Sequence, residues 1–409
     1  MDTTSWVTLR SIGAFAFLCA IAFGASPALA ARHHHSMAKP DASEDSAEAG
    51  ATDELKGPYQ EACVIEPNSG AVVFAKNEHQ PWPTASLAKM MLMEIVAEKV
   101  DDGSLTLTDQ IPTSDKAAKM GGSQVYLKPG ENFSLDDMMK AIIVHSANDA
   151  SVAVAEYVAG STEAFVLMMN ATAQKLGMKD THYYSVHGLP PGPGQPADVA
   201  SAYDQALLAR ALVRHPQILQ WSAITTAPFR AGTFELRNTN HLVFNYNGCD
   251  GLKTGFYYKA GFNVVATAHR GPMRLIAVVL GSPRKGENFR SAAEMLSVGF
   301  AQYEMKPVAK KGSAASISIA VNDGAASKLV PVFGDDAAVF MKRGDEKAAA
   351  YTVNYEVPAT IAAPIHAGQR IGKAEVMVAG QAPATVALLA PSDIAEKKPG
   401  LVDRLLSRF

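Results

Sequence analysis

The chain has few cysteines, no block of basic residues and no apolar run long enough to span a membrane. Its net charge is −3 over 409 residues, and the lack of a strongly basic stretch gives no indication of nucleic-acid binding. The apolar run at residues 12–23 is shorter than the roughly 20 residues that a transmembrane helix needs. What remains is ordinary globular composition, 48% hydrophobic and 19% charged, with room for two or three domains.

The apolar run has the flanks of an export signal. Arg10 precedes it, and Ala28-Leu29-Ala30 follows it as an A-x-A cleavage site. This arrangement is typical of a secretory signal peptide. We therefore expect residues 1–30 to be a signal peptide that is removed before Ala31, and the mature protein to be exported.

Three cysteines occur in the whole chain. Cys19 follows the bulky Leu18 inside the apolar run, which does not match a lipid-modified cysteine. The mature chain then keeps Cys63 and Cys249, far apart and each in a strand-like context. An exported compartment permits a disulfide, but this setting favours two buried thiols.

Residues 31–57 are rich in Ala, Ser, Asp and Glu without periodicity, which predicts a flexible leader. The adjacent histidines at 33–35 could form a weak metal site, but such a run in a leader usually binds nothing specific. We expect neither a metal nor a cofactor in this protein.

Residues 58–305 predict one domain that mixes strands and helices. Short apolar runs at 62–65 and 71–75 indicate a hairpin, and residues 134–223 form a mostly helical lobe. Within that lobe, Ser134 and Asp137 resemble a capping box that opens a helix to Val144. Three strands are expected next, at 251–254, 262–269 and 273–280. The last two are apolar almost throughout, which places them in the middle of a sheet covered on both faces. A further helix is expected over 288–303.

The composition changes again after residue 306. Short runs separated by Gly, Asp and Pro predict a small β domain over 306–390, with strands at 316–321, 337–340, 350–355, 373–378 and 384–389. This part contains no group of residues with a catalytic pattern. Residues 391–409 are expected to be a linker and an amphipathic C-terminal helix.

The first candidate for chemistry is the pair Ser86 and Lys89. Pro83 and Thr84 lead into a run of helix formers, and the two residues fall three apart in its first turn, on one face. A hydroxyl beside an amine is the minimum for a nucleophilic serine with a lysine base. The helix is apolar nearly all round, and burial favours the neutral amine that accepts a proton. Taken alone, the pattern is more often an N-cap serine with a surface lysine.

Two further motifs change that interpretation. Ser146 and Asn148 sit two residues apart in a break between helices, and Lys253-Thr254-Gly255 is expected at the end of a strand. Each motif is weak alone. Their order, spacing and structural settings together indicate one catalytic constellation.

With these motifs the sequence resembles the low-molecular-mass penicillin-binding proteins that act as serine-type D-alanyl-D-alanine carboxypeptidases. The resemblance runs from about residue 62 to 389, and residues 363–365 and 368–372 resemble the β domain of the type-5 group. It implies an α/β (α+β) penicillin-binding-protein/β-lactamase-like transpeptidase fold. That fold has an antiparallel sheet flanked by helices and a helical lobe, here followed by a small all-β domain. It also implies the peptidoglycan stem peptide as substrate and β-lactam antibiotics as covalent inhibitors.

The resemblance assigns catalytic roles to four residues. Ser86 would attack the carbonyl of the penultimate D-Ala and form an acyl-enzyme, with Lys89 as the base. Ser146 would relay a proton to the leaving amine. Asn148 would bind the substrate amide and orient Lys89.

Four consecutive residues would bind the substrate. Lys253 would provide a positive charge for the terminal carboxylate, with the Thr254 hydroxyl beside it, and Gly255 would let the backbone approach the substrate. The N–H groups of Phe256 and Ser86 would form the oxyanion hole. Position 256 is often polar in such carboxypeptidases, so Phe256 leaves the turnover rate and its pH dependence open.

Three alternatives remain. A D,D-endopeptidase would use the same motifs on peptide crosslinks. A β-lactamase needs a deacylation base, commonly a loop glutamate, but none is convincing here and Ala147 replaces the aspartate of its second motif. A non-catalytic peptidoglycan-binding module would tolerate loss of Lys89 or Lys253, and both are present.

The tail has an amphipathic pattern. At about 100° per residue its apolar side chains fall on one helix face: Leu401, Val402, Leu405, Leu406 and Phe409. An interfacial anchor on the inner membrane or an ordinary docked terminal helix would both produce this pattern, and the resemblance favours the anchor.

Overall fold

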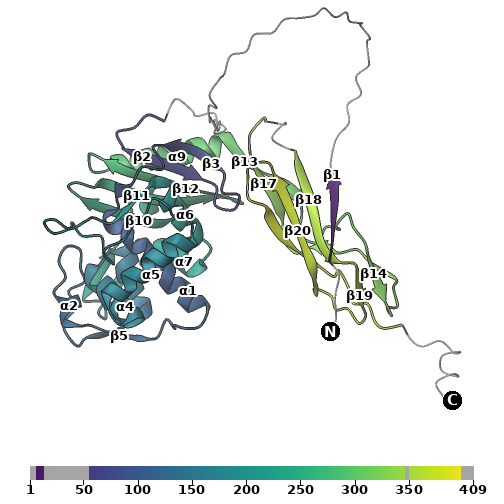
Figure 1. Ribbon diagram of the computed structural model, residues 1–409, viewed down its shortest axis with the longest axis horizontal. Helices are drawn as coiled ribbons and strands as arrows, with labels where there is room; N and C mark the ends of the chain where they lie inside the picture. The colour runs from purple at the N-terminus through teal and green to yellow at the C-terminus, as the bar shows by residue number, and fades with distance from the viewer. Residues whose placement is uncertain (1–5, 13–54, 346–349, 398–409) are drawn as a thin grey trace, which may run out of the picture.

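The computed structural model describes residues 6–12, 55–345 and 350–397, which form two domains (Figure 1). The first is built on a five-stranded sheet in the order β10-β11-β12-β2-β3, with every neighbouring pair antiparallel. Its strands are β2 (Glu61–Ile65), β3 (Val72–Lys76), β10 (Cys249–Tyr257), β11 (Gly261–Arg270) and β12 (Met273–Ser282).

Both faces of this sheet are covered, as the apolar strands predict. Val264 on β11 packs in the cluster that contains Leu296 of α9, and the next residue, Val265, packs in the cluster of the helical lobe. Successive side chains of a strand point to opposite faces, so an unbroken apolar run fits only such a central position. The catalytic-domain fold predicted from the sequence is confirmed.

The helical lobe lies on one side of the sheet and α9 on the other (Figure 1). Ser134 caps α3 by accepting the N–H of Asp137, and the expected break between helices falls between α3 and α4. The helices of this domain are α1 (Lys89–Asp101), α2 (Asp115–Ala118), α3 (Leu135–Val144), α4 (Asn148–Ala159), α5 (Thr162–Lys175), α6 (Ala202–Leu212), α7 (Pro216–Ser222), α8 (Leu242–Asn245) and α9 (Glu287–Gln302).

Short strand pairs and one 3₁₀ turn complete the first domain. The 3₁₀ turn η1 (Ala85–Ala88) runs directly into α1. The pairs are β4 (Trp82–Pro83) with β7 (Val199–Ala200), β5 (Gln110–Pro112) with β6 (Asn132–Ser134), and β8 (Thr226–Phe229) with β9 (Phe234–Arg237).

In the residues that the structure describes, the second domain is built of strands alone and has its own apolar core. Strand β13 (Tyr303–Ala309) pairs with β17, so it spans the boundary expected at residues 305 and 306. The remaining strands are β14 (Ile319–Asn322), β15 (Lys328–Leu329), β16 (Val332–Phe333), β17 (Ala337–Lys342), β18 (Tyr351–Pro358), β19 (Thr360–Ala362), β20 (Arg370–Val378) and β21 (Ala384–Leu389).

One strand comes from the far N-terminus. Residues 6–12 form β1 (Trp6–Ile12), which pairs antiparallel with β18 at the edge of the sheet β1-β18-β20-β21-β16. This strand lies within the expected signal peptide, whose removal stays a prediction. Most of the expected leader and the amphipathic part of the tail lie outside the described residues.

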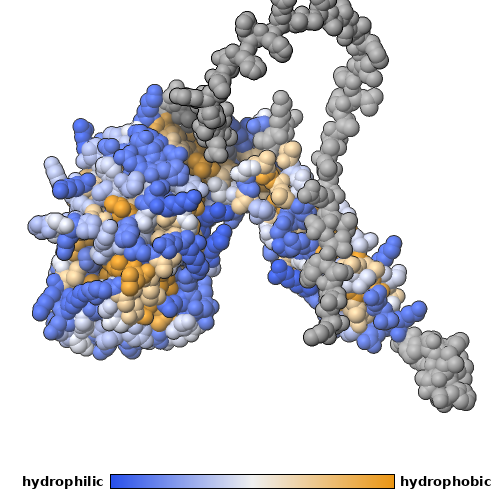
Figure 2. Space-filling model, in the orientation of Figure 1, coloured by the Kyte–Doolittle hydropathy of each residue, from blue (hydrophilic) through white to orange (hydrophobic). Residues whose placement is uncertain are grey.

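The surface seen in Figure 2 is mainly hydrophilic, with apolar side chains gathered over α4 and α5. On α5, Leu167 is 73% exposed. Within the described part of the chain, no single helix is long and apolar enough to cross a membrane. Helices α4 and α5, which are bent relative to each other at a short break, reach that length and composition only when they are taken together. Cys63 and Cys249 are both free thiols, as expected, and Cys249 is only partly buried.

Candidate active site

Ser86 lies in η1, and Lys89 begins α1. In a 3₁₀ turn, side chains three residues apart eclipse one another, which brings the amine onto the hydroxyl. Lys89 Nζ lies 2.9 Å from Ser86 Oγ and 2.7 Å from the carbonyl oxygen of His187, and it donates to both. Nucleophile and base therefore already form a hydrogen bond.

Lys89 is fully buried. Burial is the main cause that holds the pKa of its amine well below the ordinary 10.5, and the nearby charge of Lys253 lowers it further. Asp198 and Asp149 act in the opposite direction. The lowered pKa makes the neutral amine, which can accept the serine proton, more accessible than it is in an exposed lysine.

Ser146 occupies the break between α3 and α4 with a φ of +63°, a left-handed conformation that is costly for a residue other than glycine. The loop around it is held by hydrogen bonds from Ser123 Oγ to the His145 carbonyl and from the Asn148 N–H to the Ser123 carbonyl. Ser146 Oγ accepts a hydrogen bond from Lys253 Nζ at 2.9 Å. The strained turn therefore points the hydroxyl at the third motif.

Asn148 does not orient Lys89 through a hydrogen bond, because none joins these two described residues. Its side-chain amide donates to the carbonyl of Gly121 at 2.7 Å, and its Oδ1 is buried without a partner in the part of the chain that the structure describes. The His187 carbonyl holds the lysine amine instead. A backbone carbonyl carries no sequence signature, so this contact could not be predicted.

The third motif lies inside β10 and not at its end, since the strand continues to Tyr257. Lys253 is fully buried, and desolvation lowers its pKa to about 7. The Thr254 hydroxyl donates to Thr239 Oγ1 at 2.8 Å. Asn240 braces the start of the same strand by donating to the Gly251 carbonyl.

Gly255 is needed where β10 meets the nucleophile segment. A Cβ at this position would lie 2.6 Å from the carbonyl oxygen of Thr84 and 3.1 Å from the nitrogen of Ser86. Gly255 therefore allows a close approach to the chain that carries Ser86, and the approach to the substrate that the sequence suggested stays a prediction. The same contact brings the segment with the Phe256 N–H to the segment with the Ser86 N–H, the two donors expected in the oxyanion hole.

Asn263 of β11 fixes this junction, although the sequence did not single it out. It is fully buried, and its amide donates to the carbonyls of Pro83 and Thr84 at 3.0 and 3.3 Å. Its Oδ1 accepts the N–H of Gly281. The sequence feature that could have identified Asn263 is an asparagine within an otherwise apolar central strand, since a buried side-chain amide needs hydrogen-bond partners.

The three motifs border a cavity of about 240 Å³. Phe256, which is 55% exposed, stacks on Phe262 with ring centres 4.2 Å apart, and His241 stacks on Phe289 at 5.1 Å. Sequence reasoning identified Ser86, Ser146, Thr254, Gly255 and Phe256 but missed other lining residues: Ser123, Thr239, His241, Phe262, Asn263, Lys285, Asn288 and Phe289. Hydroxyl groups and aromatic rings thus line the site together.

Comparison with known proteins identifies this arrangement. The family model described as D-alanyl-D-alanine carboxypeptidase matches residues 50–284, and the model described as Penicillin-binding protein 5, C-terminal domain, matches residues 303–396. The chain belongs to the D-alanyl-D-alanine carboxypeptidase family. It is a low-molecular-mass penicillin-binding protein with a C-terminal β domain, and a serine-type peptidase, as the sequence predicted.

Individual relatives cover most of the chain. It is 34% identical to the D-alanyl-D-alanine carboxypeptidase DacF of Bacillus subtilis (strain 168), over 86% of this chain and 89% of that protein. Penicillin-binding protein 5 from Haemophilus influenzae superposes with a TM-score of 0.63 at 29% identity, covering 83% and 98% of the two chains. A peptidoglycan synthesis regulatory factor (PBP3) from Streptococcus pneumoniae gives 0.72 at 25% identity, covering 83% and 100%.

The two lysines predict the pH dependence of this carboxypeptidase. kcat/KM should rise as Lys89 loses its proton, and should fall as Lys253 loses its proton near its pKa of about 7 in the free enzyme. The falling limb arises because neutral Lys253 no longer attracts the substrate carboxylate. In Lys253→Arg the guanidinium stays charged, so the falling limb should disappear.

The measurement is kcat/KM for a soluble D-Ala-D-Ala peptide from pH 5 to 10. Lys285→Arg replaces another lysine that lines the cavity and should keep the falling limb. A falling limb that persists unchanged in Lys253→Arg would show that Lys253 does not cause it.

Proposed function

We propose that this protein removes the terminal D-alanine from peptidoglycan stem pentapeptides through an acyl-enzyme on Ser86. The observation that carries the proposal is the 2.9 Å hydrogen bond between Lys89 Nζ and Ser86 Oγ, made by a fully buried amine of lowered pKa. Such an amine takes the serine proton as the hydroxyl attacks the carbonyl of the penultimate D-Ala.

The neighbouring groups complete the reaction. The N–H groups of Ser86 and Phe256 stabilise the oxyanion. Ser146 Oγ accepts a hydrogen bond from Lys253 Nζ at 2.9 Å. It gives its proton to the leaving D-Ala amine and takes up in exchange the proton that Lys89 removed from Ser86, which returns Lys89 to its neutral form. Lys253 and Thr254 bind the terminal carboxylate. Water then hydrolyses the acyl-enzyme and releases the shortened stem peptide.

The position of β10 supports an extended substrate. This strand is the edge of its sheet, so one side of its backbone faces no strand within the described residues. An extended peptide can add to such an edge through main-chain hydrogen bonds. The stem peptide would then lie antiparallel to β10, with its reacting carbonyl over Ser86.

Ser86→Ala tests the nucleophile. Benzylpenicillin should add once to the purified protein, because the β-lactam opens on Ser86 and its leaving group stays attached. Intact-mass analysis should show the adduct in the unaltered protein and none in Ser86→Ala. A persisting adduct would contradict the assignment of Ser86.

The substrate assay separates this proposal from its alternatives. Purified protein should release free D-Ala from a pentapeptide ending in D-Ala-D-Ala, and Ser86→Ala should not. Faster cleavage of a crosslinked peptide dimer would favour the D,D-endopeptidase. If the protein forms the penicillin adduct but hydrolyses neither the pentapeptide nor the crosslinked dimer, the result would favour a non-catalytic module.

We further infer that the protein is exported and held peripherally on the outer face of the inner membrane. The N-terminal signal pattern and the amphipathic spacing of residues 401–409 support this location. Lys397, Lys398, Arg404 and Arg408 would add attraction to anionic headgroups. A segment of this length should order on binding and bind reversibly.

Removal of residues 399–409 should move the protein from the membrane fraction to the soluble periplasmic fraction. Hydrolysis of a soluble peptide should stay unchanged, because the removed segment follows the β domain. The measurement is immunoblotting of fractionated cells together with a D-Ala release assay. Truncated protein that still sediments with membranes would overturn the anchor.

A further inference from the structure

The β domain contains a strand edge that the enzymatic reaction does not use. Strand β18 lies between β20 and β1, and residues 6–12 pair with it from Trp6 opposite Pro358 to Ile12 opposite Thr352. These residues belong to the segment that we propose is removed on export. In the mature chain, that edge of β18 would then face no strand among residues 55–345 and 350–397.

The composition of β18 suits it for pairing. Its eight residues, YTVNYEVP, are mostly β-branched or aromatic, which favours extended structure. Val353, Tyr355 and Val357 alternate along it and are buried in the domain core. An edge of this length presents a row of backbone N–H and C=O groups that another extended chain can pair with.

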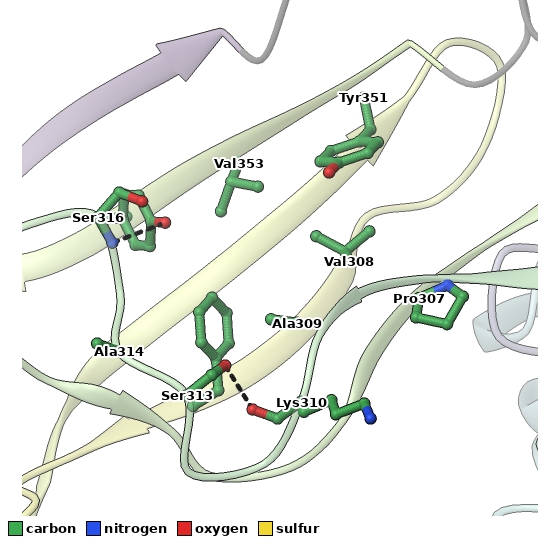
Figure 3. Close-up of a pocket in the computed structure, with 11 residues that line it drawn as sticks. Pro307, Val308, Ala309, Lys310, Ser313, Ala314, Ser316, Tyr351 and Val353 are labelled. Atoms are coloured by element: carbon green, nitrogen blue, oxygen red, sulfur yellow. Dashed lines mark hydrogen bonds between the residues drawn. The ribbon is translucent and has the colours of Figure 1, made fainter.

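A pocket lies directly beside this strand. Its volume is about 500 Å³, and Tyr351, Val353 and Tyr355 line it at every second position of β18. Figure 3 labels Tyr351 and Val353 on this side of the pocket. The opposite wall is the end of β13 and the turn after it, where Ser313 Oγ donates to the Lys310 carbonyl. The other lining residues are Pro307, Val308, Ala309, Ala314, Ser316 and Phe333.

We propose that the β18 edge and this pocket form a docking site for an extended segment of another exported protein. That segment adds as an antiparallel strand and places an apolar side chain in the pocket. Backbone hydrogen bonds provide the affinity, and the pocket selects the alternate side chains. The proposal rests on the loss of residues 1–30 and is independent of the peptidase reaction.

Two observations favour this occupant. The pairing of residues 6–12 shows that a strand fits the edge over seven consecutive positions without a break in register. The leader at 31–57 is a poor alternative, because its Ala, Asp and Glu are depleted in strands. The partner is therefore defined by its chemistry: an extended segment with an apolar side chain at every second residue.

The test uses the protein purified from the exported fraction, after its mass has fixed the N-terminus. A fluorescent peptide with the sequence of residues 6–12, WVTLRSI, is titrated against it and followed by anisotropy. We expect saturable one-to-one binding. Two N-methylated peptides test the backbone pairing, one methylated at the odd and one at the even positions. The peptide whose methylated amides face β18 should not bind, and the other should bind as the unmodified peptide does.

Two tryptophan variants test the pocket. Ala314→Trp places a large side chain at an exposed position of the pocket wall and should weaken binding at least tenfold. Ala320→Trp, at an exposed position of β14 that does not line the pocket, should change it by less than about twofold. Thermal unfolding confirms that both variants fold.

Each other result would overturn the proposal. A mature chain that keeps residues 6–12 would fill the edge itself. Absence of peptide binding, or equal binding in the two tryptophan variants, would exclude the site. If analytical sedimentation shows that the protein is a dimer, and the peptide dissociates that dimer, the edge of β18 would bind a second copy of this chain.

Discussion

Lys89→Arg should lower kcat/KM for a D-Ala-D-Ala peptide by roughly 10³-fold, within the range that general base catalysis contributes. Arginine keeps the positive charge but does not give up its proton, so it cannot accept one from Ser86. The expected loss includes acylation by benzylpenicillin, because both reactions begin with the same proton transfer. Stopped-flow acylation and D-Ala release measure the two rates.

Lys253→Arg is the matched control. It replaces the other fully buried lysine of the site but keeps the cation that the substrate carboxylate needs. We expect a loss of about tenfold, well below that of Lys89→Arg, because only the position of the charge changes. Equal losses in two folded variants would argue against a base role that is specific to Lys89.

The sequence predicted the catalytic domain well because its signals are local. The strands β11 and β12 are apolar on both faces, which fits only the middle of a covered sheet. The break before α4 lies between a capped helix and a second helical run, so it was visible too. Strand β13 was missed because Lys306 and Pro307 interrupt its pattern.

The support of the site was harder to predict because it depends on distant backbone. The carbonyl that holds Lys89 belongs to His187, 98 residues away in sequence. The His241–Phe289 pair joins the N-terminal end of α8 to α9, whereas Phe256 and Phe262 face each other across the β10–β11 hairpin. The motifs thus identified which groups react, and the tertiary structure shows what positions them.

Gly255→Ala should lower kcat/KM by roughly 10²- to 10³-fold, comparable to the loss of an oxyanion-hole donor. The added Cβ would lie 2.6 Å from the Thr84 carbonyl oxygen and 3.1 Å from the Ser86 nitrogen, both of them backbone atoms. Asn263, which pairs with Gly255 across the β10–β11 hairpin, donates to the same Thr84 carbonyl, so moving the nucleophile segment away would break this hydrogen bond. The separation of the two N–H donors must therefore change.

A second glycine separates this effect from a loss of stability. Gly103 follows α1 with a φ of +79° and open space around it, so Gly103→Ala strains the backbone without touching the site. This control should unfold at a lower temperature and keep full activity. Gly255→Ala should lose acylation by benzylpenicillin while it remains folded. Normal acylation of Gly255→Ala would show that the contact between β10 and the Ser86 segment does not set the geometry of the reaction.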